Sequence, residues 1–324
     1  MAPPRWFPLL LLFAACSACS ACSGFSAPSP TPAEAPVPRP PKPSPVAIAP
    51  PSTRPVEPIA APADATVSPE NNSRPQAPPE SSVPLANPDD TRALVLMYHA
   101  FNRGTEDLTV DGSQFERQLA WLQQNDVAIV PTSALVRFLR REQALPLRVA
   151  VVTLDDGDKS VHSVAWPILQ KLRVPFTLAL PTKLMNENKL HRMLTWDQVR
   201  EMVDSGLCEV ASHGHEHKSI IHFSSEQALR QLETSRDILE KETGQRPTTY
   251  FYPLGAFDAR TAGLVEQVGY RAAFKASGAP VGLDCCNLYA IPRMGIVHRD
   301  TVWSLGWYYS PRFLDRMIRL PRTG

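Results

Sequence analysis

Two adjacent carboxylates, Asp155 and Asp156, follow the apolar run RVAVVTL. Neighbouring carboxylates repel each other, and the pKa of one rises sharply unless a cation lies close by. If Asp156 binds a divalent metal, Asp155 stays ionised beside a metal-bound water and can accept its proton. A bound metal lowers the pKa of water from about 15.7 towards about 7, so a carboxylate is then a sufficient base. The pair therefore indicates hydrolytic attack on a carbonyl group.

Several histidines also follow apolar runs. His213 comes after CEVAS, with His215 and His217 just beyond it, and His99 comes after ALVLMY. Imidazole and carboxylate groups together suit a borderline cation such as zinc. If the chain turns helical after CEVAS, His213 and His217 share a face, and if it stays extended, His215 shares that face with them. Gly214 disfavours a regular helix, so the spacing leaves both ligand sets open.

The elements that must position these residues alternate along the chain from residue 93 onwards. Runs such as ALVLMY, RVAVVTL and FTLAL lack polar alternation, which is typical of strands buried on both faces. Amphipathic stretches between them predict helical crossovers, and the alternation repeats about seven times. The sequence therefore predicts an α/β fold, either a (β/α) barrel or a doubly wound sheet. Both place functional residues at the carboxyl ends of strands, where the aspartates and histidines stand.

Local signals mark the ends of two of the predicted helices. Two pairs of residues have the spacing of a capping box, namely Thr195 with Gln198 and Ser224 with Gln227. In a capping box, the side chain of the first residue accepts a hydrogen bond from the backbone N–H of the second, and the side chain of the second accepts one from the backbone N–H of the first. Gly244 predicts the end of the helix that Ser224 begins, because glycine adopts the left-handed conformation of a helix C-terminus.

Length, composition and net charge limit the kinds of protein that this chain can be. The chain has 324 residues, 43% of them hydrophobic, and a formal net charge of +1. This length can bury one good-sized core, and the nearly neutral charge argues against a nucleic-acid partner.

Residues 1–23 read as a lipoprotein signal peptide. The segment MAPPRWFPLLLLFAAC has a positive start and a short apolar stretch that is too short to span a bilayer. FAAC resembles a bacterial lipoprotein cleavage box, which makes Cys16 the predicted lipidation site, and Ser17 beside it resembles a signal for the outer membrane. The alternative is an ordinary signal peptide cut a few residues later. We expect a lipid-anchored protein of the bacterial cell envelope, on the outer membrane and facing the periplasm.

Residues 24–90 are rich in proline and alanine and predict a disordered tether, because proline fixes φ and lacks the amide hydrogen that helices and sheets need. Residues 91–324 are the predicted globular domain. Of its three cysteines, Cys208 begins the run that ends at His213 and should lie opposite the metal end. Cys285 and Cys286 are adjacent and do not readily bridge each other, and we expect no catalytic cysteine.

Three motifs, TLDDG, SHGHEH and YFYPLGAFD, resemble in order and separation the central motifs of the carbohydrate esterase family 4 polysaccharide deacetylases, the NodB-homology domain. The resemblance spans about residues 94–293 and implies a deformed (β/α)7 barrel. It implies that Asp155 is the general base and that Asp156, His213 and His217 bind the divalent metal. Zinc is the first expectation for this metal, with cobalt and nickel as alternatives.

The sequence departs from the usual family pattern at two places, and in both it resembles one branch of the family. Phe251 stands where the third motif usually carries arginine, and a late Leu-x-His motif is missing. In the branch that deacetylates poly-β-1,6-N-acetylglucosamine, the barrel is circularly permuted and the acid histidine lies on the first strand, which here is His99. The resemblance further suggests that Arg293 holds the base and that the backbone N–H of Leu254 holds the oxyanion. His298 is a rival for the general acid.

The resemblance thus implies a metal-dependent hydrolase that removes N-acetyl groups from an N-acetylglucosamine polysaccharide. The alternatives are a catalytically silent sugar-binding lipoprotein on the same fold, and a hydrolase of another amide or ester, such as peptidoglycan or chitin fragments. Expected partners are the polysaccharide, the membrane through the lipid anchor, and proteins of polysaccharide export or synthesis.

Overall fold

The computed structural model describes residues 87–101, 108–187, 192–284 and 287–310. The predicted signal peptide, the lipidation site Cys16, nearly all of the predicted tether, and the pair Cys285 and Cys286 lie outside the described residues. Among the described helices, none is both long and apolar enough to cross a membrane.

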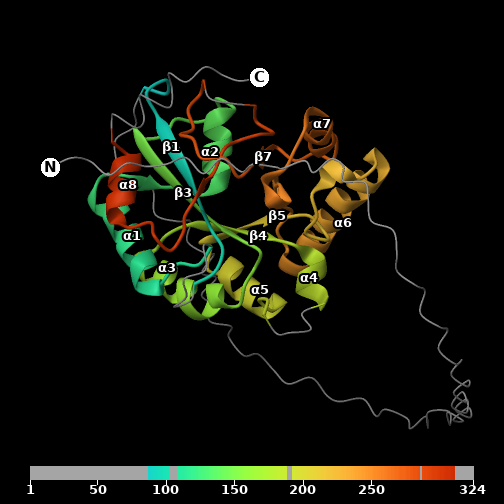
Figure 1. The fold of residues 1–324 in the computed structure, drawn as a ribbon, viewed down its shortest axis with the longest axis horizontal. Helices are drawn as coiled ribbons and strands as arrows, with labels where there is room; N and C mark the ends of the chain where they lie inside the picture. Colours follow the sequence, from blue (N-terminus) through green and yellow to red (C-terminus); the bar gives the residue numbers. More distant parts are fainter. Residues whose placement is uncertain (1–86, 102–107, 188–191, 285–286, 311–324) are drawn as a thin grey trace, which may run out of the picture. The chain divides into compact units, whose positions relative to one another are not determined.

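The domain is built on a parallel sheet surrounded by helices (Figure 1). Its strands pair in the order β7-β6-β5-β4-β3-β1-β8, and β2 pairs with the first half of β3. Every pairing between these strands is parallel. The strands are β1 (Arg92–Tyr98), β2 (Ala128–Ile129), β3 (Arg148–Asp155), β4 (Phe176–Leu180), β5 (Cys208–Ser212), β6 (Thr249–Phe251), β7 (Ala272–Phe274) and β8 (Met294–Gly295).

Helices connect these strands as the alternating pattern predicted. They are α1 (Gly112–Gln124), α2 (Thr132–Leu139), α3 (Trp166–Leu172), α4 (Thr182–Glu187), α5 (Trp196–Asp204), α6 (Ser225–Thr243), α7 (Ala259–Gln267) and α8 (Val302–Tyr308), with the short turns η1 (Val161–Ala165), η2 (Ile220–His222) and η3 (Pro253–Gly255). The predicted capping boxes of α5 and α6 are both formed, and Gly244 ends α6 with a φ of 71°. These three local predictions are confirmed.

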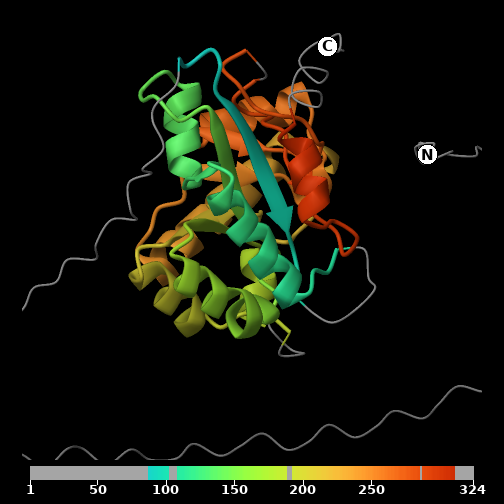
Figure 2. The same cartoon turned by 90° about the vertical axis from the view of Figure 1, so that its left-hand side faces the viewer.

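The two faces of the sheet have different partners. Along β3, residues 150, 152 and 154 pack with α1, α3 and α5, whereas residues 149 and 151 pack with α2. Figure 2 shows α2 and α1 in succession alongside β1. Successive side chains of a strand point to opposite faces, so Thr153 and Asp155 belong to the face that α2 covers. The base predicted from the sequence therefore lies on this inner face of the sheet, at the carboxyl end of β3.

The segment 291–296 contacts β7, at one end of the sheet, and β1, near the other end. Ile291 pairs with Phe274 of β7, and Met294 pairs with Leu96 of β1 as part of β8. The backbone N–H of Ile296 donates to the carbonyl oxygen of Met97 at 2.9 Å. The segment 291–296 thus lies between the two ends of the sheet, and this curled arrangement confirms the predicted deformed (β/α) barrel. The circular permutation stays a prediction.

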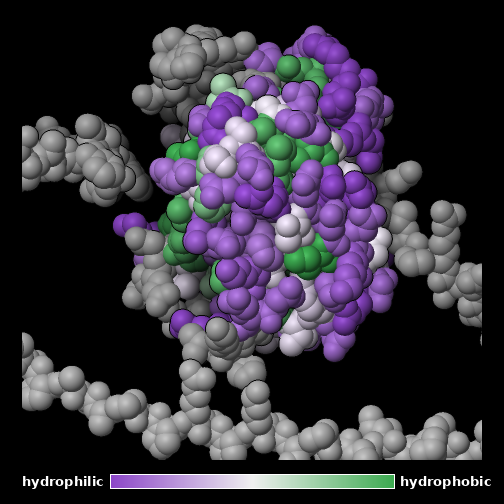
Figure 3. All heavy atoms as spheres, turned by 90° about the vertical axis from the view of Figure 1, so that its right-hand side faces the viewer, coloured by the Kyte–Doolittle hydropathy of each residue, from purple (hydrophilic) through white to green (hydrophobic). Residues whose placement is uncertain are grey.

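The outer side of α6 and α7 is mostly polar. The face drawn in Figure 3 is largely hydrophilic, with apolar residues in small separate groups. Polar residues on the solvent side of these helices are what the amphipathic pattern predicts.

Candidate active site

The backbone at the end of β3 sends the two aspartates in different directions. Asp155 is the last residue of the strand and is 1% exposed, whereas the side chain of Asp156 is 37% exposed. Asp156 has a φ of 70°, in the left-handed region, and Gly157 follows with a φ of 74°. A non-glycine residue in this region stores strain on the order of 1 kcal/mol. The turn separates the two carboxylates and directs Asp156 towards the rim of the barrel.

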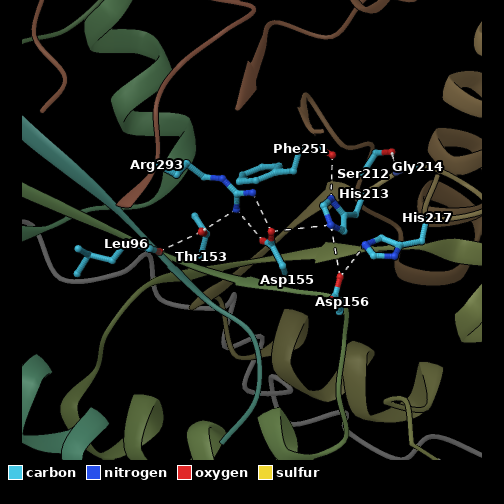
Figure 4. A network of polar contacts seen from close by, with 10 residues as sticks. All are labelled: Leu96, Thr153, Asp155, Asp156, Ser212, His213, Gly214, His217, Phe251 and Arg293. Carbon is cyan, nitrogen blue, oxygen red and sulfur yellow. Dashed lines mark hydrogen bonds and ion pairs between the residues drawn. The ribbon is translucent and has the colours of Figure 1, made fainter. Parts of the chain in front are cut away.

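Asp156, His213 and His217 come together at this rim (Figure 4). Oδ1 of Asp156 lies 3.0 Å from Nε2 of His217 and 3.4 Å from Nε2 of His213. One ligand atom from each residue lies within 4.8 Å of the other two. These are the three residues that the resemblance assigned to the metal.

The loop after β5 settles which histidines converge. The chain is neither helical nor extended after His213, because Gly214 and His217 both have positive φ angles, 76° and 55°. His215 points away from the other two imidazoles, and its Nδ1 lies 2.9 Å from Oγ1 of Thr182. Both sequence alternatives for this loop were therefore wrong about the backbone.

The chemistry of the three ligand atoms fits a cation. Nδ1 of His213 lies 2.8 Å from the carbonyl oxygen of Phe251 and must donate to it, so in the neutral imidazole Nε2 carries a lone pair. Oδ1 of Asp156 is buried and, apart from the two imidazole nitrogens that face it, has no hydrogen-bond partner among the described residues. The contact with Asp156 raises the pKa of His217 above its ordinary value. Lone pairs that face one another need a proton or a cation between them, and a divalent metal suits this ligand set.

Arg293 holds Asp155. Its Nη1 donates to Oδ1 at 2.7 Å and its Nη2 donates to Oδ2 at 2.8 Å, and both side chains are almost fully buried. Burial alone would raise the pKa of Asp155, but the charges of Arg293 and His213 outweigh it and hold the pKa below its ordinary value. Oδ2 lies 3.8 Å from Nε2 of His213. The result is an ionised carboxylate directed at the cluster of Asp156, His213 and His217.

Arg293 reaches this place from the segment that closes the sheet. Its guanidinium carbon lies 4.7 Å from the centre of the Phe251 ring. Phe251 occupies the position where the third family motif usually has arginine, and here its ring supports an arginine that comes from elsewhere in the chain. The sequence suggestion that Arg293 takes over the contact with the base agrees with this geometry.

His99 follows β1 at the same rim. Burial lowers its pKa, whereas the charges of Asp155 and Asp156 act to raise it. Its Nδ1 is buried without a hydrogen-bond partner among the described residues. His298, the rival for the general acid, lies beyond β8 in the loop before α8. Tyr98 and Leu154 are register partners on β1 and β3, so His99 and Asp155, which follow them, lie at the same end of the paired strands.

Leu254 lies in the η3 turn directly after β6. It has a φ of 59°, and its side chain is 78% exposed. Gly255 also has a positive φ, and a Cβ at this position would lie 2.6 Å from Cβ of Ala276. The N–H of Gly255 donates to the carbonyl oxygen of Tyr252 at 2.9 Å. The backbone at Leu254 is therefore held in a fixed turn at the end of the strand beside β5.

Two contributions escaped the sequence analysis. Asp158, which directly follows the TLDDG motif, accepts a hydrogen bond from the N–H of Ser160 at 2.8 Å, and Oγ of Ser160 accepts from the N–H of Phe101 at 2.9 Å. This chain of contacts joins the loop after β3 to the segment that carries His99. Thr153 also contacts Arg293. The residue types gave no signal for either, because the contacts of Ser160 with Phe101 and of Thr153 with Arg293 join residues that are far apart in the sequence.

Comparison with known proteins agrees with this site. Residues 142–273 match the family model of the polysaccharide deacetylases. This part of the chain resembles the polysaccharide deacetylases. The matched range includes Asp155, Asp156, His213 and His217, whereas His99 and Arg293 lie outside it.

Named proteins are similar to a longer part of the chain. The poly-β-1,6-N-acetyl-D-glucosamine N-deacetylase of Staphylococcus aureus is 25% identical over 209 residues, which cover 61% of this chain and 71% of that protein. The Streptococcus pyogenes deacetylase PplD, solved in complex with acetate, superposes with a TM-score of 0.64 at 22% identity, over 68% of this chain and 99% of that one. IcaB from Ammonifex degensii gives a TM-score of 0.61 at 22% identity, over 67% and 97%. The two structures share the fold of this chain.

Proposed function

We propose that this protein removes N-acetyl groups from an N-acetylglucosamine polysaccharide by metal-dependent hydrolysis. The observation that carries the proposal is the buried Asp155, held ionised by Arg293, next to the cluster of Asp156, His213 and His217. The named S. aureus relative supports poly-β-1,6-N-acetylglucosamine as the favoured substrate. Peptidoglycan and chitin fragments carry the same acetamide group and are the alternatives to test.

Asp156, His213 and His217 would hold a divalent cation, zinc first, with cobalt or nickel as alternatives. When bound, such a cation polarises the substrate carbonyl and lowers the pKa of water to about 7. The hydrogen bond from His213 to the carbonyl oxygen of Phe251 fixes which ring nitrogen is available to the cation.

Asp155 is the general base of the proposed reaction. Arg293 occupies one lone pair on each carboxylate oxygen, and each oxygen keeps a second one. Oδ2 faces the metal ligands and can take the proton of the attacking water. Because Arg293 keeps the group ionised, the base is ready at neutral pH.

Two further groups complete the proposed hydrolysis. The backbone N–H of Leu254 is assigned to the oxyanion, a fixed donor of a kind worth about 3–4 kcal/mol in other hydrolases. His99 is assigned to protonate the nitrogen as the C–N bond breaks, which gives acetate and a free amine. The proton comes from the imidazolium form of His99, and burial, which lowers the pKa of His99, makes that form a stronger acid.

The silent sugar-binding protein is the second candidate, because Phe251 replaces the usual arginine. Arg293 weakens this argument, since it makes the bidentate contact with the base from another segment.

Acetate release tests the proposed function. The full-length chain, solubilised in detergent and stripped of metal with a chelator, is expected to release no acetate from β-1,6-linked N-acetylglucosamine oligomers, and zinc or cobalt should restore release. Chitin oligomers and peptidoglycan fragments, assayed in parallel, decide between the substrates. If metal binds without release from any of them, the silent binder is the better description.

We also propose that lipidation of Cys16 anchors the chain to the outer membrane, facing the periplasm, near proteins that synthesise or export the polysaccharide. The support is the sequence FAAC at the end of a short apolar segment. Replacing Cys16 by Ser is expected to move the protein from the membrane fraction of a producing bacterium to the soluble fraction, with Cys19→Ser as the matched control. If both variants stay in the membrane fraction, Cys16 is not the anchor.

A further inference from the structure

Thr153 makes two directed contacts with its single hydroxyl. It lies on β3 two residues before Asp155, is fully buried, and shares the inner face of the sheet with that aspartate. Its Oγ1 donates to the carbonyl oxygen of Leu96 at 3.0 Å and accepts from Nη1 of Arg293 at 3.2 Å (Figure 4). A threonine hydroxyl has one proton, and Leu96 takes it, so a lone pair is turned towards Arg293.

Pairing holds the backbone on both sides of Arg293, since Ile291 pairs with Phe274 and Met294 pairs with Leu96. The place of its long side chain, in contrast, depends on side-chain contacts. Its Nε is buried and has no hydrogen-bond partner among the described residues. The guanidinium is therefore located by three neighbours, namely the carboxylate of Asp155, the hydroxyl of Thr153 and the ring of Phe251.

The three neighbours come from two strands, and the partner of the hydroxyl comes from a third. Thr153 and Asp155 belong to β3, Phe251 belongs to β6, and the carbonyl that orients the hydroxyl belongs to β1. The Thr153 hydroxyl thus ties β1 and β3 to the arginine of the closing segment. Without the Thr153 hydroxyl, the guanidinium of Arg293 would keep its contact with Asp155 but lose the contact that connects it to β1 through the carbonyl oxygen of Leu96.

We infer that Thr153 is a positioning residue for the general base, and that it acts through Arg293. It holds the guanidinium in the orientation in which both oxygens of Asp155 are bonded and Oδ2 faces the metal ligands. The inference rests on the proposed function, since it concerns the orientation of the base in that reaction.

Removing the hydroxyl while keeping the shape tests this role. Thr153→Val is expected to lower kcat for acetate release about tenfold at nearly unchanged KM, because small errors in the place of a reacting group reduce the rate strongly. Thr153→Ser keeps the hydroxyl and is expected to restore kcat to within about twofold of the wild type. Thr153→Ala removes the hydroxyl together with the γ-methyl group of threonine and adds no new group. It should repeat the loss of kcat if the valine variant folds poorly.

Thr177 offers a matched control. It is the register partner of Thr153 on β4 and is 1% exposed, and its hydroxyl lies 2.6 Å from that of Thr132 rather than near Arg293. Thr177→Val removes a buried hydroxyl contact of comparable kind and is expected to leave kcat within about twofold of the wild type. Thermal unfolding of each variant reports the stability lost at the two positions.

The inference is overturned if Thr153→Val keeps the wild-type kcat, or if Thr177→Val loses as much kcat as Thr153→Val. It is also overturned if Thr153→Ser fails to restore kcat. A wild-type protein that releases no acetate with metal bound contradicts the proposed function itself. An active wild type with an inactive Asp155→Asn variant supports that function, and the threonine comparison then decides the inference alone.

Discussion

Asp155→Asn is expected to lower kcat for acetate release by about 10²–10⁴-fold, the range attributed to general acid–base catalysis. Asparagine has nearly the same shape as aspartate but offers no lone pair basic enough to accept the proton of the attacking water. The effect should fall on kcat, because the substituted group lies beside the metal ligands and on the buried inner face, 1% exposed. The rate of acetate release at saturating oligomer measures it.

The same substitution should also destabilise the protein, and this complicates the assay. Arg293 is 1% exposed and would lose the carboxylate that neutralises it. Breaking a buried ion pair by removing one partner typically costs about 3–5 kcal/mol. A loss of activity in Asp155→Asn alone could then report unfolding instead of chemistry.

The double variant Asp155→Asn with Arg293→Met separates these effects. It removes the unpaired charge together with its partner, so urea unfolding should show that part of the lost stability returns. Activity should remain absent, because no base has been restored. Acetate release by the double variant at a rate near that of the wild type would show that Asp155 is not the base.

Local sequence patterns predict the strands and much of the site, but not the backbone of the loop after β5. The strands, the two capping boxes and the rim that collects Asp155, Asp156 and His213 follow from local patterns and from the rule that parallel strands end together. The sequence also identified His217 as a candidate ligand. It did not predict the backbone that brings His217 to Asp156, since that backbone depends on positive φ angles in the loop after β5.

The contacts that hold the base were beyond local reasoning. Arg293 lies 138 positions from Asp155 along the chain, and Thr153 lies 140 positions from Arg293. Only the closure of the sheet by the segment 291–296 brings them together. The missing arginine at position 251 could be noticed in the sequence, but the ring that supports its replacement could be recognised only in the structure.

His217→Ala is expected to weaken metal binding by at least about 100-fold, more than the 10- to 100-fold typical of residues that only support a ligand. Nε2 of His217 lies 3.0 Å from Oδ1 of Asp156, so its removal takes away one of three protein ligand atoms. Metal-dependent acetate release should fall with it at limiting zinc. Titration of the stripped protein with zinc against a chromogenic chelator measures the affinity.

His215→Ala is the matched control, since it removes the same side chain from the same loop. His215 contacts Thr182 and lies outside the ligand cluster. Its variant should therefore bind zinc with nearly the affinity of the wild type. Equal weakening by both substitutions would mean that the loop is merely disturbed, and an unchanged affinity in His217→Ala would remove His217 from the metal site. Because the two residues are two positions apart, a difference between their variants can be assigned to the direction in which each imidazole points.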